Sequence, residues 1–195
     1  MTAVTRLAAV GARVGESPLW LPDRKLWLWL DLQGRSVHAF DPATSTDRVI
    51  AQGFAEDLAC LARWKPEACL LVSTRGFHRL ALDSGTATPL ACPIDLPPGT
   101  IFNDGKVDRH GALWLGSSDA AEAAPLGRLW RIAGTGVTEV AAGFVVSNGP
   151  AFAPDGSCAY FADTFARRLL RFGLDLDGSP VSQSVCATLG DAEGY

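Results

Sequence analysis

Residues 147–164 read SNGPAFAPDGSCAYFADT, and the second half of this stretch has the pattern of a tight turn followed by a buried strand. Asp155-Gly156 is a common turn pair, and the following run CAYFAD is rich in apolar and aromatic residues. Turns of the same kind precede apolar strands at Pro22-Asp23, Pro66-Glu67 and His110-Gly111. His110 and Asp155 are 45 residues apart. The chain therefore repeats with a period of about 44 residues.

Each copy of the repeat also contains a second hairpin half that resembles an outer strand. These segments are Ser36–Pro42, Gly76–Gly85, Gly127–Gly134 and Arg167–Gly178. Four short strands in each repeat predict an all-β fold, a β-propeller with about four blades in this chain. A β-sandwich is the alternative, but its regularly spaced strands give no reason for a self-similar repeat.

Composition limits the partners and the compartment. The chain has 48% apolar residues and a net charge of -4, and it lacks the Lys and Arg runs that bind nucleic acid or a membrane surface. The apolar run Leu7–Val10 is too short for a signal peptide or a membrane span. Five cysteines without C-x-x-C spacing suggest reduced thiols. We therefore expect a cytoplasmic protein with no nucleic-acid or membrane partner, which binds a small molecule.

Polar side chains share one position in the repeat. Counting back seven residues from each turn reaches Glu16, Asn103 and Asn148, whereas the second copy has Ala59 or Cys60 there. The first strands of propeller blades line a central channel, so these three side chains should converge. Carboxylate and amide oxygens suit Ca²⁺, Mg²⁺ or Mn²⁺. Taken singly, each asparagine is better explained by a turn and Glu16 by a solvated loop, and it is their common position in the repeat that favours a site.

Three sequence blocks carry a family resemblance. They are GESPLW at Gly15–Trp20, NDGKVD at Asn103–Asp108 and SNGPAFAPDG at Ser147–Gly156. Together they resemble the senescence-marker-protein/gluconolactonase (regucalcin-like) family. The resemblance implies a six-bladed propeller that hydrolyses sugar lactones or related small esters with one divalent cation, Ca²⁺, Zn²⁺, Mn²⁺ or Mg²⁺. It further implies metal ligation by Glu16 and Asn148, and contact with the substrate or the metal-bound water by Asn103.

Two further acids are candidates for substrate contact. Asp119 and Glu122 follow the third inner strand, where the family often presents an acid to the substrate. Surface exposure is the alternative for both. No G-x-S-x-G elbow or Ser-His-Asp triad is evident, and His38, His78 and His110 are expected to be ordinary surface residues of outer strands and turns.

The chain departs from the family pattern in two ways. Ile101 stands where family members usually carry an arginine that faces substrate. Six blades need about 260 to 300 residues, so we expect residues 1–195 to form a single incomplete propeller domain, truncated at its C-terminus. The aspartate that would be the third ligand and the catalytic base is then expected beyond Tyr195. No catalytic residue is matched within the chain.

Two expectations follow from an incomplete ring. The chain could be a non-catalytic propeller segment or binding module that lacks a full metal site, which is the alternative to a lactone hydrolase. Blades at the ends of an open arc leave sheet edges uncovered, so self-association through these edges is also expected.

Overall fold

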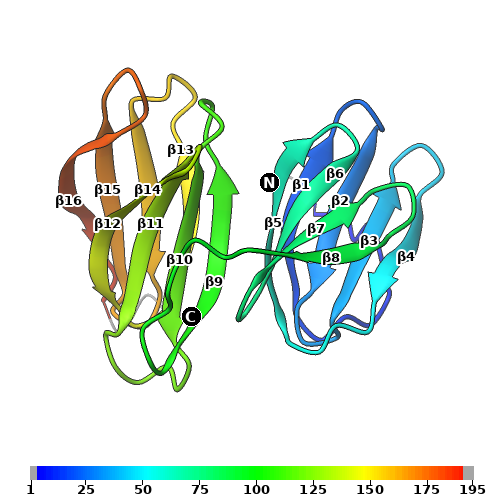
Figure 1. Cartoon of the computed structure of the whole chain (residues 1–195), viewed down its shortest axis with the longest axis horizontal. Helices are drawn as coiled ribbons and strands as arrows, with labels where there is room; N and C mark the ends of the chain where they lie inside the picture. The colour runs from blue at the N-terminus through cyan, green and yellow to red at the C-terminus, as the bar shows by residue number, and fades with distance from the viewer. Residues whose placement is uncertain (1–3, 191–195) are drawn as a thin grey trace. The chain divides into compact units, whose positions relative to one another are not determined.

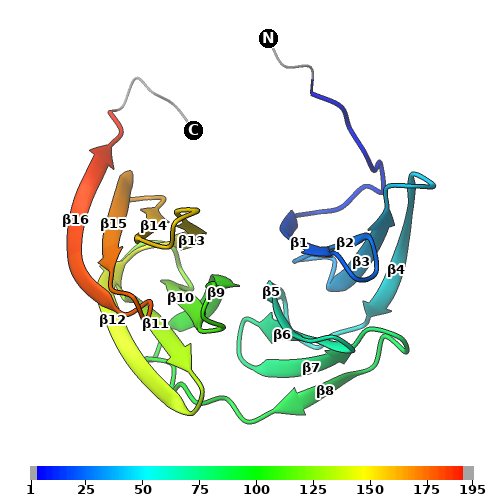
Figure 2. The ribbon, with the colours of Figure 1, turned by 90° about the horizontal axis from the view of Figure 1, so that it is seen from above.

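The computed structural model describes residues 4–190, and all of its regular structure is β-strand. Sixteen strands form four antiparallel sheets of four strands each (Figure 1). In every sheet the strands follow one another in chain order, as Figure 2 shows. The sheets group into two compact units, Met1–Ala91 and Cys92–Tyr195, which we describe separately.

The first unit contains two of these sheets. The first sheet is built from β1 (Gly15–Leu21), β2 (Leu26–Asp31), β3 (Ser36–Asp41) and β4 (Thr46–Gln52). The second sheet is built from β5 (Leu58–Lys65), β6 (Ala68–Ser73), β7 (Phe77–Ala81) and β8 (Ala87–Leu90).

The second unit repeats this plan. Its first sheet is built from β9 (Thr100–Val107), β10 (Leu113–Asp119), β11 (Gly127–Ala133) and β12 (Gly136–Phe144). Its second sheet is built from β13 (Ser147–Phe152), β14 (Cys158–Asp163), β15 (Arg168–Leu174) and β16 (Pro180–Thr188).

The repeat predicted from the sequence is confirmed. Each of the four turn pairs lies between the first and the second strand of a sheet, because Asp, Pro and Gly supply the backbone conformations of a tight turn. Gly156, for example, has a φ of 77°, a conformation that glycine adopts without strain. The four predicted hairpin halves contain the third strands β3, β7, β11 and β15.

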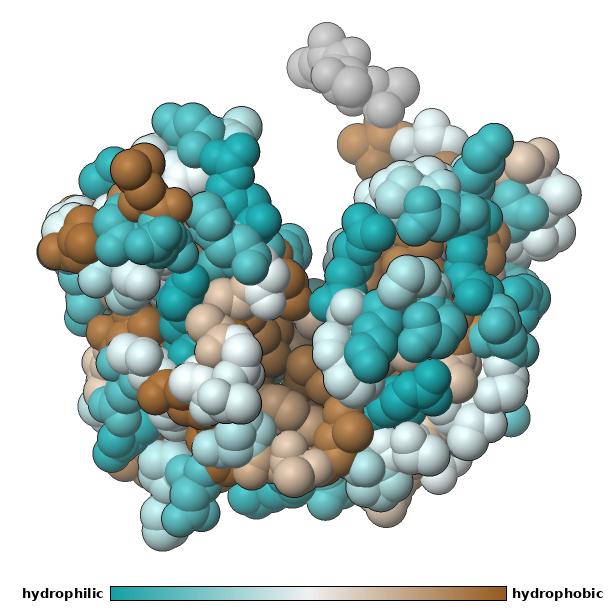
Figure 3. Space-filling model, turned by 45° about the horizontal axis from the view of Figure 1, so that its top comes forward, coloured by the Kyte–Doolittle hydropathy of each residue, from teal (hydrophilic) through white to brown (hydrophobic). Residues whose placement is uncertain are grey.

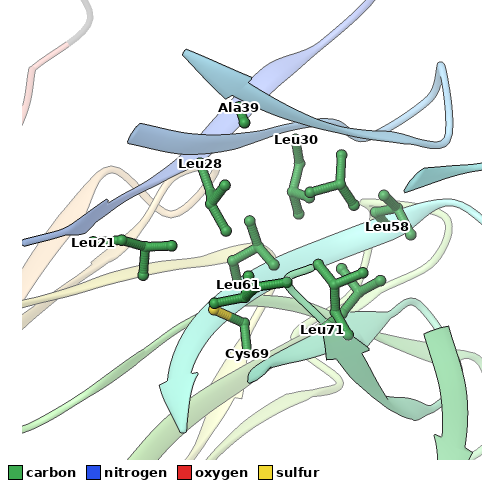
Figure 4. Close-up of a cluster of buried hydrophobic side chains, with 11 residues drawn as sticks. Leu21, Leu28, Leu30, Ala39, Leu58, Leu61, Cys69 and Leu71 are labelled. Carbon is green, nitrogen blue, oxygen red and sulfur yellow. The ribbon is translucent and has the colours of Figure 1, made fainter. Parts of the chain in front are cut away.

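Leucines dominate the core of the first unit. Leu28 and Leu30 of β2 lie with Leu58 and Leu61 of β5 in one buried cluster, drawn in Figure 4, so the two sheets cover each other's apolar faces. Alternation along LWLWLD puts the leucines of β2 on this face and Trp27 and Trp29 on the other.

Trp114 of β10 is the largest fully buried side chain of the second unit. Its ring lies 6.0 Å from that of Phe161 and 6.3 Å from that of Phe172, on the neighbouring sheet. Its indole N–H donates to the Asp108 carboxylate at 3.0 Å, so the one polar atom of this ring is satisfied in the core.

The surface is mixed in character. Figure 3 shows hydrophilic residues over much of the visible face, with hydrophobic residues exposed between them. Within residues 4–190 there is no helix long and apolar enough to cross a membrane. All five cysteines are free thiols.

We predict that Trp114→Ala lowers the free energy of unfolding by about 3 to 5 kcal/mol, because it removes the central ring of an aromatic core and one hydrogen bond to the buried Asp108 carboxylate. Urea denaturation measures this change. The matched control is Trp64→Ala, since Trp64 is 46% exposed on β5 and its loss should cost less than about 1 kcal/mol. Equal costs for the two tryptophans would contradict the packing described.

Candidate metal and substrate site

Asn103 and Asn148 are the two asparagines of the chain, and they meet in the second unit. The side-chain amide of Asn103, on β9, donates to the Ser147 carbonyl at 2.7 Å and to the Asn148 Oδ1 atom at 3.3 Å. Asn148, on β13, donates its own amide to the Thr164 hydroxyl at 2.6 Å. This network orients both amides and leaves the Asn103 Oδ1 atom without a hydrogen bond to the residues described.

A proline-containing bulge shapes the backbone around Asn148. The pairing of β13 with β14 is interrupted between Asn148 and Ala151. Gly149 has a φ of 107°, and Pro150 has no N–H to give to a neighbouring strand. The ladder therefore breaks immediately after Asn148, as expected for a β-bulge that re-aims a side chain.

The same bulge occurs at Glu16 in the first unit. The pairing of β1 with β2 is interrupted between Glu16 and Leu19. Ser17 has a φ of 52°, and Pro18 follows it. The sequences ESP and NGP thus share a residue with a positive φ before a proline, although φ is 52° at Ser17 and 107° at Gly149 and only the Gly149–Pro150 bond of the two is cis.

The Glu16 side chain is exposed, and no hydrogen bond within the described part of the chain involves its carboxylate. It lines a groove of about 650 Å³ in the first unit, whose walls include Trp27, Trp29 and Phe40. Because Glu16 and the two asparagines belong to different units, their convergence stays a prediction.

Asp104 is a structural residue that the sequence analysis missed. Its Oδ2 atom accepts the Gly149 amide at 2.9 Å, and its Oδ1 atom accepts the Gly105 amide at 2.8 Å. The carboxylate thereby ties β9 to the bulge of β13. The block NDG thus supplies both Asn103 and the aspartate that fixes the backbone beside Asn148.

Asp119 lies at the end of β10, where its carboxylate organises the loop that follows. Backbone amides of Ala124, Ala123 and Ala121 donate to it at 2.8, 2.9 and 3.2 Å. These bonds lower the pKa of Asp119 below its usual value. Glu122 is exposed in the same loop with a φ of 55°. Substrate contact by either acid stays a prediction, and the contacts of Asp119 favour a role in holding the loop.

Ile101 is half-buried on β9, where its Cα pairs with that of Ser118. Among residues 4–190 no group of three or more His, Cys, Asp and Glu side chains could hold a metal ion. The predicted third ligand falls beyond Tyr195 and therefore outside the described residues.

The expectation that His38 is an ordinary surface residue is wrong. His38 is buried, with Nε2 2.9 Å from the Ser36 hydroxyl and Nδ1 2.7 Å from the Asp47 carboxylate. Asp47 also accepts the indole N–H of Trp29 at 2.7 Å. The alternation of SVHAF puts Ser36 and His38 on the same face of the sheet, and this pattern could have predicted their contact. This network ties β2, β3 and β4 together.

Comparison with known proteins identifies the family of the chain. Residues 14–195 match the family model described as "SMP-30/Gluconolactonase/LRE-like region". Pentonolactonase XacC from Haloferax volcanii is 31% identical over 92% of this chain and 60% of its own length. A 6-deoxy-6-sulfogluconolactonase from Pseudomonas putida is 30% identical over 93% of this chain and 62% of its own.

Solved structures of similar fold include a protein of the same group. Regucalcin from Agrobacterium tumefaciens, described as a calcium-binding protein, superimposes with a TM-score of 0.80 at 27% identity, covering 92% of this chain and 61% of that structure. The all-β, β-propeller prediction is confirmed, with four blades in this chain. The chain spans about three fifths of the length of the relatives it matches. It belongs to the SMP-30/gluconolactonase/LRE-like family.

Proposed function

We propose that this chain supplies part of the active site of a metal-dependent hydrolase of sugar lactones or related small esters. The observation that carries the proposal is the contact between Asn103 and Asn148, which joins the two asparagines of the chain across two sheets. The names of the relatives, a pentonolactonase and a sulfogluconolactonase, support sugar lactones as the substrate class.

The donor groups fit a divalent cation. Glu16 offers an exposed carboxylate and Asn148 an amide oxygen, and each is the last paired residue of its strand before a bulge. Oxygen donors of this type suit Ca²⁺, Mg²⁺ or Mn²⁺, and Zn²⁺ also accepts carboxylates. When bound, the cation would polarise the lactone carbonyl and stabilise the negative charge that develops on its oxygen.

The residues of the chain would then orient the ligand, contact the substrate and hold the neighbouring loop. Asn148 is held by the amide of Asn103 and by Thr164, so its Oδ1 atom is pre-oriented as a ligand. Asn103 presents its Oδ1 atom to a donor such as a sugar hydroxyl. The carboxylate of Asp119 is engaged by three backbone amides of its own loop, which favours a structural role. The proton of the attacking water therefore needs another carboxylate, and Glu122 is left to contact substrate from its exposed loop.

The alternative function is a non-catalytic propeller segment or binding module. An assay for lactone hydrolysis separates it from the enzyme, since a binding module would bind a sugar lactone without opening it.

The proposal also includes the cytoplasm as the location, supported by five cysteines that are all free thiols.

We predict that Glu16→Gln and Asn148→Ala, made in a protein that joins this chain to the remaining blades expected from the family resemblance, each lower metal-dependent hydrolysis of a sugar lactone by about 100-fold, because each removes one of few metal ligands. Initial rates with added Ca²⁺, Mn²⁺ or Zn²⁺ test this. Glu67→Gln is the matched control, an exposed glutamate between β5 and β6, and should keep the full rate. Equal rates for all four proteins would contradict the ligand assignment.

We predict that Asn103→Ala acts mainly on substrate binding. Loss of its Oδ1 atom should raise KM by about tenfold. The variant also removes the Asn103 amide from Asn148, but kcat should change less because Asn148 keeps its hydrogen bond to Thr164. Steady-state kinetics across lactone concentrations measure both values. A fall in kcat at unchanged KM would instead assign Asn103 to the transition state.

We propose that the protein self-associates through β16. This edge strand, PVSQSVCAT, has no charged residue, and its Val185 is 52% exposed, so it lacks the charges that discourage edge-to-edge pairing. Val185→Lys should shift the protein toward monomer in light scattering. The control is Val137→Lys on the edge strand β12, which already carries Glu139. An unchanged oligomer in Val185→Lys would contradict the proposal.

A further inference from the structure

Two buried aspartates follow the two proposed metal ligands at the same spacing in the sequence. Asp31 follows Glu16 by 15 residues, and Asp163 follows Asn148 by the same number. Each ends the second strand of its sheet, β2 or β14, beside the start of the first strand. Asp31 is 7% exposed and Asp163 is fully buried. Buried carboxylates are costly unless they are well paired, so both must have partners.

Asp31 holds the backbone that leads into Glu16. Its carboxylate accepts the amides of Arg13 and Val14 at 3.1 Å each, and the amide of Gly34 at 3.0 Å. The amide of Leu32, next in the chain, donates to the Val14 carbonyl at 2.9 Å. The segment two and three residues before Glu16 is therefore fixed from both of its hydrogen-bonding sides.

Asp163 repeats this arrangement for Asn148. Its Oδ1 atom accepts the amides of Val145 and Val146 at 3.2 and 3.4 Å, again two and three residues before the ligand. The amide of Thr164 donates to the Val146 carbonyl at 3.0 Å. Arg168 pairs with the Oδ2 atom of Asp163 at 2.8 Å and so keeps the carboxylate in place.

The other two sheets lack this clamp. In the β5–β8 sheet the equivalent residue is Ser73, whose hydroxyl donates to Glu56 at 2.9 Å, and the position 15 residues earlier is Leu58. In the β9–β12 sheet Asp119 lies 16 residues after Asn103 and turns to its own loop. The clamp thus occurs in the two sheets whose first strand carries the ESP or NGP bulge.

We propose that Asp31 and Asp163 are positioning residues for the metal site, an inference that rests on the proposed function. Each carboxylate fixes the two amides before a bulge, so that the bulge presents Glu16 or Asn148 in one orientation. A metal ligand must be held within a few tenths of an ångström of its place, and a loosely held donor binds weakly.

The charge of Asp31 agrees with this role. Burial raises its pKa, but the hydrogen bonds from Val14, Arg13 and Gly34 outweigh burial, and the pKa lies below its usual value. Asp31 is therefore ionised at neutral pH, and a carboxylate accepts amide hydrogen bonds more strongly than a neutral group does.

The test compares metal affinity with thermal stability. Asp31→Asn and Asp163→Asn should each weaken Ca²⁺ or Mn²⁺ binding, measured by calorimetric titration well below the Tm, by about 10- to 100-fold. Asp108→Asn is the matched control. Asp108 is also buried and accepts the amides of His110 and Ala112, but it holds the turn at the far end of β9. This variant should lower the Tm and keep the wild-type Kd.

Two further measurements keep the proposal open to refutation if the asparagine variants do not fold. Asp31→Ser and Asp163→Ser introduce the residue that the β5–β8 sheet carries at this position, and they should weaken binding in the same way. In the unmodified protein, added metal should slow hydrogen exchange at the amides of residues 13, 14, 145 and 146.

The outcomes separate the two proposals. If metal binding is absent, or is unaffected by Glu16→Gln and Asn148→Ala, the proposed site itself fails, and the positioning role with it. If those two variants weaken binding while the Asp31 and Asp163 variants lower only the Tm, the site stands and the positioning role is overturned.

Discussion

Every sheet in this protein depends on a neighbouring sheet to cover its apolar face. A four-stranded sheet cannot bury its own leucines. Leu28 and Leu30 of β2 are buried because leucines of β5 pack against them. In the second unit Trp114 has the same relation to Phe161 and Phe172. Because the second strands are so deeply buried, the aspartates that end β2, β10 and β14 can accept backbone amides away from competing water.

The bulges in β1 and β13 determine where the pairing of the first strand with the second is interrupted. A regular strand would give each residue a ladder partner, but Pro18 and Pro150 cannot donate, and the residue before each has a positive φ. The break therefore falls directly after Glu16 and Asn148. Two chemically different side chains, a carboxylate and an amide, thus occupy the same place relative to a break in the pairing.

The sequence predicts the strands and the position of the asparagines well, because both depend on local signals. Turn pairs such as Asp155-Gly156 fix the phase of the repeat, and counting from them identifies Asn103 and Asn148 although they are 45 residues apart. The network of His38 was missed, since a histidine on an outer strand looks exposed until its sheet face is known to be covered. Likewise, which amides Asp104 and Asp119 accept depends on loop conformation, which composition does not reveal.

The acids near the proposed ligands of the two units divide according to side-chain length. The carboxylates of Asp31, Asp104, Asp119 and Asp163 all accept backbone amides, because a short side chain keeps its oxygens close to the local backbone. The longer Glu16 and Glu122 have exposed carboxylates with no hydrogen-bond partner among residues 4–190. Aspartates therefore fix the backbone around the proposed ligands within each unit. A carboxylate that must stay available to a cation or a substrate is better supplied by a glutamate, unless the backbone around an aspartate offers no amide.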